Sequence, residues 1–175
     1  MNPFMTRMLR AAKLDVPLYE EVEADQSAMP QAMGVVVLSS LAAGVGSVAN
    51  LGLGGILLGS LAALGSWYIW AWLTYFIGTR FLAEAQTEAD LGQLLRTTGF
   101  SSSPGLIRVL GIIPGLGPIV FVVAAIWMLV TMVIAVRQAL DYTSTLRALG
   151  VCVIGWIVQT LILVVLFALL GGGVS

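Results

Sequence analysis

The chain has no histidine, one cysteine and few charged side chains, and each of these shortages excludes a kind of protein. Without histidine it lacks the commonest general base, the commonest zinc ligand and the usual axial ligand of haem. Its only cysteine, Cys152, has no second thiol with which to form an intramolecular disulfide. Charged residues make up 10% of the chain, whereas soluble domains carry roughly 25%. So few charges could not cover a water-soluble core, and we expect lipid to be the outer solvent.

Apolar residues are the largest class of residues in the chain. They make up 59% of the 175 residues, and the net charge is −1. This composition predicts an integral membrane protein whose main partner is the lipid bilayer. A net charge near zero provides no basic field for nucleic acid, and without histidine no cofactor or metal site can be recognised. We therefore predict no nucleic-acid partner, no cofactor and no metal ligands.

The apolar segments predict an all-α fold with five transmembrane helices. A membrane helix needs about 20 apolar residues to cross roughly 30 Å of hydrocarbon, so residues 33–82 must hold two. Asn50 and the glycines after it supply the turn between them. The predicted helices cover approximately residues 32–50, 55–79, 104–117, 118–138 and 148–170. Residues 31–175 would thus form one membrane domain, preceded by a cytoplasmic arm of residues 1–30.

The third of these segments is short, because the run Pro114-Gly115-Leu116-Gly117-Pro118 interrupts it. It either crosses a thinned bilayer or re-enters without crossing. With five crossings and a cytoplasmic N-terminus, all eight lysine and arginine residues face the cytoplasm. A re-entrant segment would move Arg137 and Arg147 to the other side, which the positive-inside rule opposes. We therefore predict five crossings, with residues 83–100 as an amphipathic connection at the membrane surface.

The N-terminal arm predicts a helix that lies on the membrane surface. In residues 1–14, apolar side chains share one helical face, and Arg7, Arg10 and Lys13 lie on the other, where we expect them to face anionic headgroups. A solvated tail is the alternative. Residues 15–30 are acidic and bracketed by prolines, which predicts a polar linker.

Small residues recur at every fourth position in the first two predicted spans. They are Ser39, Ala43 and Ser47 in the first span and Gly55, Gly59 and Ala63 in the second. Small side chains let helix backbones approach closely, which favours helix association in lipid. We interpret both stripes as helix-packing faces. A contact between the two spans is favoured over a contact with another subunit, because a short turn joins them. Gly59→Leu should then weaken that contact.

Two strongly polar side chains fall inside the predicted spans, namely Arg108 and Gln159. An ionisable group inside the membrane is a candidate functional residue, because holding it in lipid is costly. Arg108 lies near the cytoplasmic start of its span, so we expect its guanidinium to extend to the membrane surface. Gln159 lies near the middle of the last span, where a hydrogen bond to another helix is the expected use.

Three stretches carry a family pattern: MLRAAKLDVPLYEEVEAD near the N-terminus, LGQLLRTTGFSSSP before the third span, and IAVRQALDYTSTLRAL after the fourth. Gly99, Phe100 and Pro104 form a Gly-Phe-x-x-x-Pro element. The chain thereby resembles the Yip1 domain family, whose own element is Gly-Tyr-x-x-x-Pro, and in particular its short bacterial members. The resemblance implies five spans, a cytoplasmic N-terminus and a place in the bacterial plasma membrane.

Nothing in the sequence resembles an enzyme's active site. We expect a non-enzymatic scaffold or accessory protein that organises partner proteins or the bilayer, with other membrane subunits or a second copy as partners. The eukaryotic members' association with vesicle traffic and Rab-type GTPases is not carried over, because their Asp-Leu-Tyr-Gly-Pro element is missing. A small transporter or channel subunit is the alternative, since interrupted helices often line binding sites.

Overall fold

The structure, a computed structural model, describes residues 2–47 and 52–171, and every regular element in these ranges is helical. In chain order the helices are α1 (Pro3–Ala12), α2 (Val16–Ala24), η1 (Gln26–Ala28), α3 (Met29–Gly46), α4 (Gly52–Arg80), α5 (Leu91–Ser101), η2 (Ser103–Ile112), α6 (Gly117–Ala139) and α7 (Thr145–Gly171). Four of the described helices, α3, α4, α6 and α7, are long and apolar enough to cross a membrane. The protein is therefore an all-helical membrane protein.

The third predicted span, at residues 104–117, corresponds to η2, a 3₁₀-helix of ten residues. Pro104 stands in its first turn, where a missing backbone N–H costs nothing. A 3₁₀-helix rises about 2.0 Å per residue, so ten residues extend about 20 Å instead of the roughly 15 Å of an α-helix. The short third segment is thus lengthened by its helix type, which the sequence pattern did not predict.

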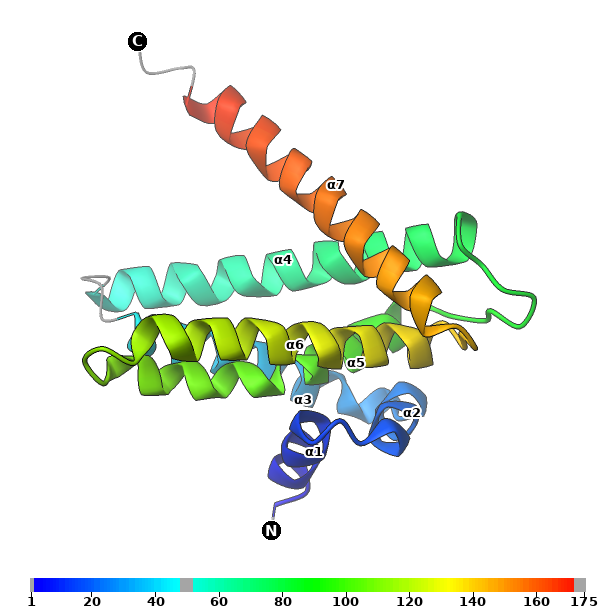
Figure 1. Cartoon of the computed structure of the whole chain (residues 1–175), viewed down its shortest axis with the longest axis horizontal. Coiled ribbons are helices and arrows are strands. Elements are labelled where there is room, and N and C mark those ends of the chain that lie inside the picture. The colour runs from blue at the N-terminus through cyan, green and yellow to red at the C-terminus, as the bar shows by residue number, and fades with distance from the viewer. Residues whose placement is uncertain (1, 48–51, 172–175) are drawn as a thin grey trace.

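The long helices run back and forth along one axis (Figure 1). The loops at residues 81–90 and 140–144 lie at one end together with α2, and we call this the charged end because it carries most of the acidic and basic side chains. The opposite end holds the junction between η2 and α6, at residues 113–116, and the facing ends of α3 and α4. We call it the turn end. There Gly115 has a φ of 85°, a left-handed conformation that glycine adopts without strain.

Local signals place the helix boundaries at the charged end. Asp90 and Gln93 form a capping box at the start of α5, in which each side chain accepts a hydrogen bond from the other residue's backbone N–H. After α1 and α6 the chain turns through Leu14 and Asp141, both with positive φ. A left-handed residue just past a helix ends it by redirecting the backbone.

Most of the buried side chains lie at the charged end, in two clusters. In one, Leu94 of α5 packs with Ile77 of α4 and Leu140, and in the other, Leu18 and Tyr19 of α2 pack with other apolar residues. Eight consecutive residues of α5, from 94 to 101, are buried. The expected surface connection at residues 83–100 is therefore wrong for its second half, because α5 lies inside the bundle.

The predicted polar linker at residues 15–30 is also wrong, because α2 and η1 occupy it. Between its acidic residues, α2 carries an apolar face in which Leu18, Tyr19 and Val22 are fully buried. Helix α2 packs on α5 and α6 and thereby joins the N-terminal arm to the bundle.

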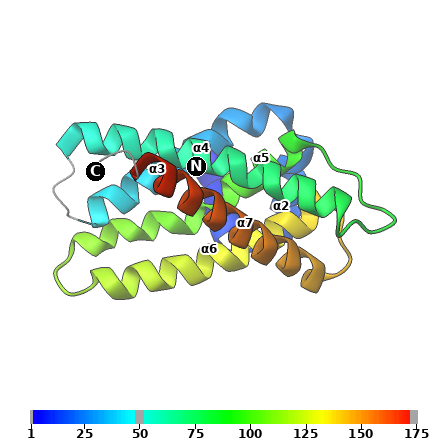
Figure 2. The same cartoon turned by 90° about the horizontal axis from the view of Figure 1, so that it is seen from above.

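Helix α7 diverges from the bundle toward its C-terminal end (Figure 1). Its first half packs on α4 and α6, where Ala148, Val151 and Cys152 are buried. Its second half leads away from both, and Figure 2 shows it passing over the other helices when the molecule is seen from above. Trp156 and Leu161, for example, are exposed to 69% and 59%. This half of α7 therefore presents apolar side chains outward.

Candidate functional site: a polar cleft inside the bundle

Helix α3 and the segment α5–η2 run side by side in the same direction and approach each other closely. A Cβ atom at Gly99 would lie 2.7 Å from the Cβ of Ala32, and one at Gly111 would lie 2.6 Å from the carbonyl oxygen of Gly46. Between these points, a side chain at Gly105 would collide with Ser39. Glycine at these positions therefore lets two backbones approach closely, as small residues do in membrane proteins.

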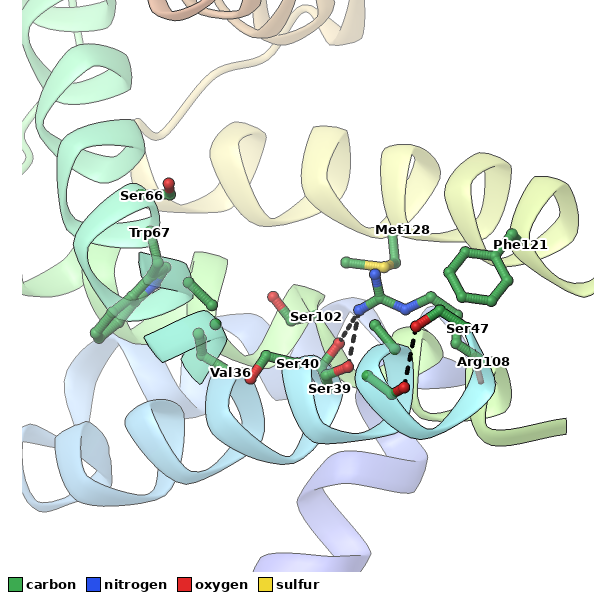
Figure 3. Close-up of a pocket in the computed structure, with 14 residues that line it drawn as sticks. Val36, Ser39, Ser40, Ser47, Ser66, Trp67, Ser102, Arg108, Phe121 and Met128 are labelled. Atoms are coloured by element: carbon green, nitrogen blue, oxygen red, sulfur yellow. Dashed lines mark hydrogen bonds between the residues drawn. The ribbon is translucent and has the colours of Figure 1, made fainter. Parts of the chain in front are cut away.

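This approach brings Arg108 of η2 against the middle of α3. Its Nη2 donates hydrogen bonds to the Ser39 Oγ at 2.6 Å and to the Ser39 carbonyl oxygen at 3.0 Å. Its Nε donates to the carbonyl oxygen of Gly105 at 3.0 Å. The expectation that Arg108 extends to the membrane surface is therefore wrong, because α3 holds its guanidinium inside the bundle. Figure 3 shows the guanidinium between Ser39 and Met128 of α6.

A cleft with a volume of about 560 Å³ opens beside Arg108, between α3, α4, η2 and α6. This volume lies within the range of roughly 300 to 1,000 Å³ that is typical of ligand pockets. Five serines contribute to its lining, together with small and apolar residues (Figure 3). The serines are Ser39, Ser40, Ser47, Ser66 and Ser102. Hydroxyl groups and one guanidinium thus meet in a space with otherwise apolar walls.

The predicted small-residue stripes line this cleft. Ala43 and Ser47 contribute from α3, and Gly59 and Ala63 contribute from α4. The two stripes face the same space, but the structure differs from the predicted close packing, because a Cβ at Gly59 would meet nothing within 4 Å. Gly55 lies in α4, and its surroundings fall outside the described contacts. The small residues of α3 and α4 therefore leave room between the helices, while α3 packs closely on η2.

The Gly-Phe-x-x-x-Pro element lies at the junction of α5 and η2, next to the cleft. Gly99 permits the approach to α3 described above, and Phe100 is fully buried among residues of α2 and α3. Pro104 is buried at the start of η2. The element therefore fixes the junction between the α-helix α5 and the 3₁₀-helix η2. It thereby positions Arg108, which lies about one turn after Pro104.

Two basic residues of the N-terminal arm form ion pairs within the arm, which the sequence did not predict. The guanidinium of Arg7 forms ion pairs with Glu21 at 2.9 Å and Asp25 at 2.8 Å. The guanidinium of Arg10 forms ion pairs with Asp15 and Glu21, both at 2.6 Å. Arg10 and Arg7 lower the pKa of Glu21. Hydrogen bonds from Ser27 and then from Arg7 lower the pKa of Asp25.

Two arginines are thus paired with carboxylates within the arm, and the contact of the three basic residues with headgroups stays a prediction. Lys13 is exposed and forms no ion pair with any residue that the structure describes. The helix that was predicted in residues 1–14 is present as α1, and the indole N–H of Trp127 donates a hydrogen bond to the carbonyl oxygen of Ala12 at 2.8 Å. Helix α1 is therefore attached to α6 as well as to α2.

Gln159 lies in the outer half of α7 and is partly exposed. Within the described part of the chain, its side chain has no hydrogen-bond partner, so the expected bond to another helix is not present here. No group of three or more acidic, histidine or cysteine side chains that could hold a metal ion occurs among the described residues.

The sequence did not single out several residues that the structure makes important. Ser66 and Ser102 line the cleft, and Arg96 links α5 to α2 by donating hydrogen bonds to the carbonyl oxygens of Val22 and Glu23. Ser66 continues the small-residue stripe of α4 by a further turn, and this spacing could have identified it. Arg96 and Ser102 had no such signal, because their partners are distant in the sequence.

Comparison with known proteins supports the family pattern found in the sequence. The model of the Yip1 domain matches residues 23–167, which is most of the chain. No curated protein and no solved structure matches it. The matched range begins in α2 and ends in the outer half of α7, so it includes the packed charged end and the cleft. The chain therefore belongs to the Yip1 domain family.

Proposed function

We propose that the protein is a non-enzymatic scaffold or accessory subunit of a bacterial plasma membrane, which binds other membrane-spanning chains or a second copy of itself. The observation that carries this proposal is Trp156. At 1.5 Å per residue it lies about 16 Å along α7 from Thr145, near mid-membrane if the helix starts at the surface. Its side chain is 69% exposed.

A tryptophan in this place is unusual, because tryptophans collect at the membrane surface, where the indole N–H can meet water. The Trp156 N–H has no hydrogen-bond partner among the described residues. A neighbouring helix with a carbonyl or hydroxyl oxygen would satisfy the N–H and cover the ring. The divergence of α7 from the bundle provides space for such a helix.

Isolation from native membranes in a mild detergent, followed by identification of the co-purifying chains, tests this proposal. We expect a chain that co-purifies with the wild type, or the second copy of a dimer, to be absent when Trp156→Ala is isolated. Leu146→Ala is the matched control, because Leu146 is an apolar residue of α7 that is 80% exposed, but lies at the charged end. An unchanged set of partners in Trp156→Ala would contradict the assignment of this surface.

We further propose that the chain crosses the membrane five times, with its N-terminus in the cytoplasm. The segment α5–η2 passes from the charged end to the turn end beside α3, and its 21 helical residues extend about 35 Å. In a Cys152→Ser background, a cysteine at Leu116 should react with impermeant thiol reagents from outside, and one at Gln86 should not. Labelling of both from one side would contradict the third crossing.

A small transporter or channel subunit is the second candidate, and the cleft beside Arg108 is the observation that favours it. Interrupted helices and intramembrane charges often form substrate sites. A saturable solute flux in proteoliposomes that Arg108→Gln abolishes would favour this candidate over the scaffold.

A further inference from the structure

Arg108 is a positive charge inside the bundle without an opposite charge nearby. All nine acidic residues of the chain lie in residues 15–25, in residues 84–90 or at Asp141, and the last two of these regions form the loops of the charged end. The ion pairs of the described residues involve Arg7, Arg10 and Arg147, and none involves Arg108. No carboxylate side chain among the described residues therefore neutralises this guanidinium.

The hydrogen bonds of Arg108 leave its charge in place. They go to the Ser39 hydroxyl and to the carbonyl oxygens of Ser39 and Gly105, which are neutral acceptors. They use Nε and Nη2, and Nη1 has no acceptor among the described residues. A guanidinium prefers to bind an oxyanion through two of its N–H groups at once. Arg108 therefore keeps a donor for a ligand that is not part of the chain.

The cleft beside Arg108 can accommodate such a ligand. Ser102 and Ser66 line it, and their hydroxyl groups make no hydrogen bond to any residue that the structure describes. Val36 and Phe121 give it apolar walls. The space left at Gly59 keeps the side toward α4 open. One cationic donor, two available hydroxyls and apolar walls match a small oxyanion or the anionic group of an amphiphile.

We propose that this cleft binds an oxyanion, a carboxylate or phosphate carried either by an amphiphile or by a small solute, with Arg108 as its counter-ion. A bound anion supplies the negative charge that the chain lacks, and so offsets the cost of holding a guanidinium in the membrane. Ser102, which lies nearer to Arg108 than Ser66 does in Figure 3, donates a further hydrogen bond. This site goes beyond the scaffold role and does not depend on it.

Binding to the purified full-length protein in a neutral detergent tests the proposal, with thermal stability and equilibrium binding of labelled ligand as readouts. Oleate is the probe for an amphiphile, and methyl oleate, which has the same chain but no charge, is its control. Inorganic phosphate is the probe for a free oxyanion. We expect saturable binding of oleate or of phosphate that stabilises the protein, and no saturable binding of methyl oleate.

The variants separate the charge from the shape of the cleft. Arg108→Gln should weaken binding at least about tenfold, because it removes the charge and a charge-assisted hydrogen bond. The affinity of Arg108→Lys should lie between those of the wild type and Arg108→Gln, since lysine keeps the charge but not the planar pair of donors. Arg80→Gln is the matched control, because Arg80 is an exposed arginine at the end of α4, and it should bind as the wild type does.

Gly59→Leu gives a second test if Arg108→Gln does not fold. The structure has room for a Cβ at this position, and the longer side chain would fill part of the cleft without changing any charge. We expect a folded protein with at least about tenfold weaker binding. Preference for oleate would identify a lipid-derived ligand, and preference for phosphate a soluble one. The proposal is overturned if neither probe binds saturably, or if the Gly59→Leu variant, or a folded Arg108→Gln, binds as the wild type does.

Discussion

The charged end and the turn end of the bundle are built differently. At the charged end, α5 lies among the long helices and α2 packs against α5 and α6, so that side chains such as Leu94, Phe100 and Tyr19 are fully buried. Toward the turn end, α4 and α7 expose apolar side chains, and a cleft separates α4 from α3.

The difference follows from the solvent that each end meets. Where helices border water, burial of apolar side chains lowers the free energy, so a packed core forms. Inside lipid this driving force between helices is absent, and helices stay together only where backbones approach closely or polar groups pair. The approach of α3 to η2 and the hydrogen bonds of Arg108 are such contacts. Helix α4 is joined to α3 by the hydrogen bond from the Ser40 hydroxyl to the Ser60 hydroxyl at 3.1 Å, while the neighbouring Gly59 leaves open space. Five changes test this comparison, in order of decreasing effect.

Arg96→Met should have the largest effect on stability. Arg96 is 6% exposed, and its guanidinium satisfies the last carbonyl groups of α2, at Val22 and Glu23. Without it these oxygens lose their charged donor, and we expect a loss of about 3 kcal/mol in the free energy of unfolding. Denaturant unfolding in mild detergent measures this, with the exposed Arg80→Met as the control. Equal stability of both variants would show that α2 is held by apolar contacts alone.

Gly99→Ala and Gly59→Ala compare the same substitution at a tight and an open position. At Gly99 the new methyl group would lie 2.7 Å from Ala32, and we expect a loss of about 1 to 3 kcal/mol. At Gly59 the methyl group meets nothing within 4 Å, so stability should stay within about 0.5 kcal/mol or rise slightly. Thermal unfolding of both variants is the measurement. A large loss of stability in Gly59→Ala would instead support the predicted contact between the two stripes.

The stability of the charged end should depend on the protonation of Glu23. Burial raises the pKa of its carboxyl group to about 7, the negative charge of Asp141 adds to the rise, and Arg96 opposes it. The folded protein therefore holds this proton more tightly than the unfolded chain does. Stability should fall as the pH rises from about 4.5 to about 7.

Glu23→Gln should flatten this part of the stability profile, because glutamine does not titrate. The pKa of Glu21 and of Asp25 is lowered, so their contributions are lost only as the pH falls below the range of unfolded carboxyl groups. Unfolding measured between pH 4.5 and 8 separates the two effects. An identical slope in wild type and Glu23→Gln would contradict the assignment to Glu23.

The ion pairs of the arm should contribute less, because they are partly exposed. Arg7→Glu should lower stability by about 1 kcal/mol or less, and Glu21→Arg in the same chain should restore part of it. Added salt should reduce the effect. A double-mutant cycle gives the coupling energy, and a value near zero would mean that α1 is held by Trp127 and its apolar contacts. Lys13→Glu is the matched change at a residue without such partners.

Gln159→Leu should have the smallest effect. Its side chain has no hydrogen-bond partner among the described residues, and its neighbours on α7 are apolar apart from Thr160, whose hydroxyl donates to the Trp156 carbonyl oxygen. We expect unchanged thermal stability and an unchanged set of co-purifying chains. If the substitution removed a partner that Trp156→Ala also removes, Gln159 would belong to the surface proposed for that partner.

Several features of the fold could be predicted from local sequence. Five spans were predicted from the apolar runs, and four of them are present as α3, α4, α6 and α7, which lie within a few residues of the expected ranges. The α1 helix and the break at Pro114 to Pro118 were predicted from residue types that act within one or two turns. The family was predicted from short motifs, and the match to the Yip1 domain confirms it.

The buried position of α5, the pairing of Arg7 with Glu21 and the contact of Arg108 with Ser39 could not be predicted in this way. Hydropathy and helix signals depend on neighbouring residues in the chain. These three features depend instead on residues 14 to 69 positions apart, which only the packing of the helices brings together. The same acidic segment could have remained a solvated linker, and the same arginine could have extended to the membrane surface. Which of these occurs is decided by whether a partner helix offers carboxylates, hydroxyls or close backbone contacts at that place.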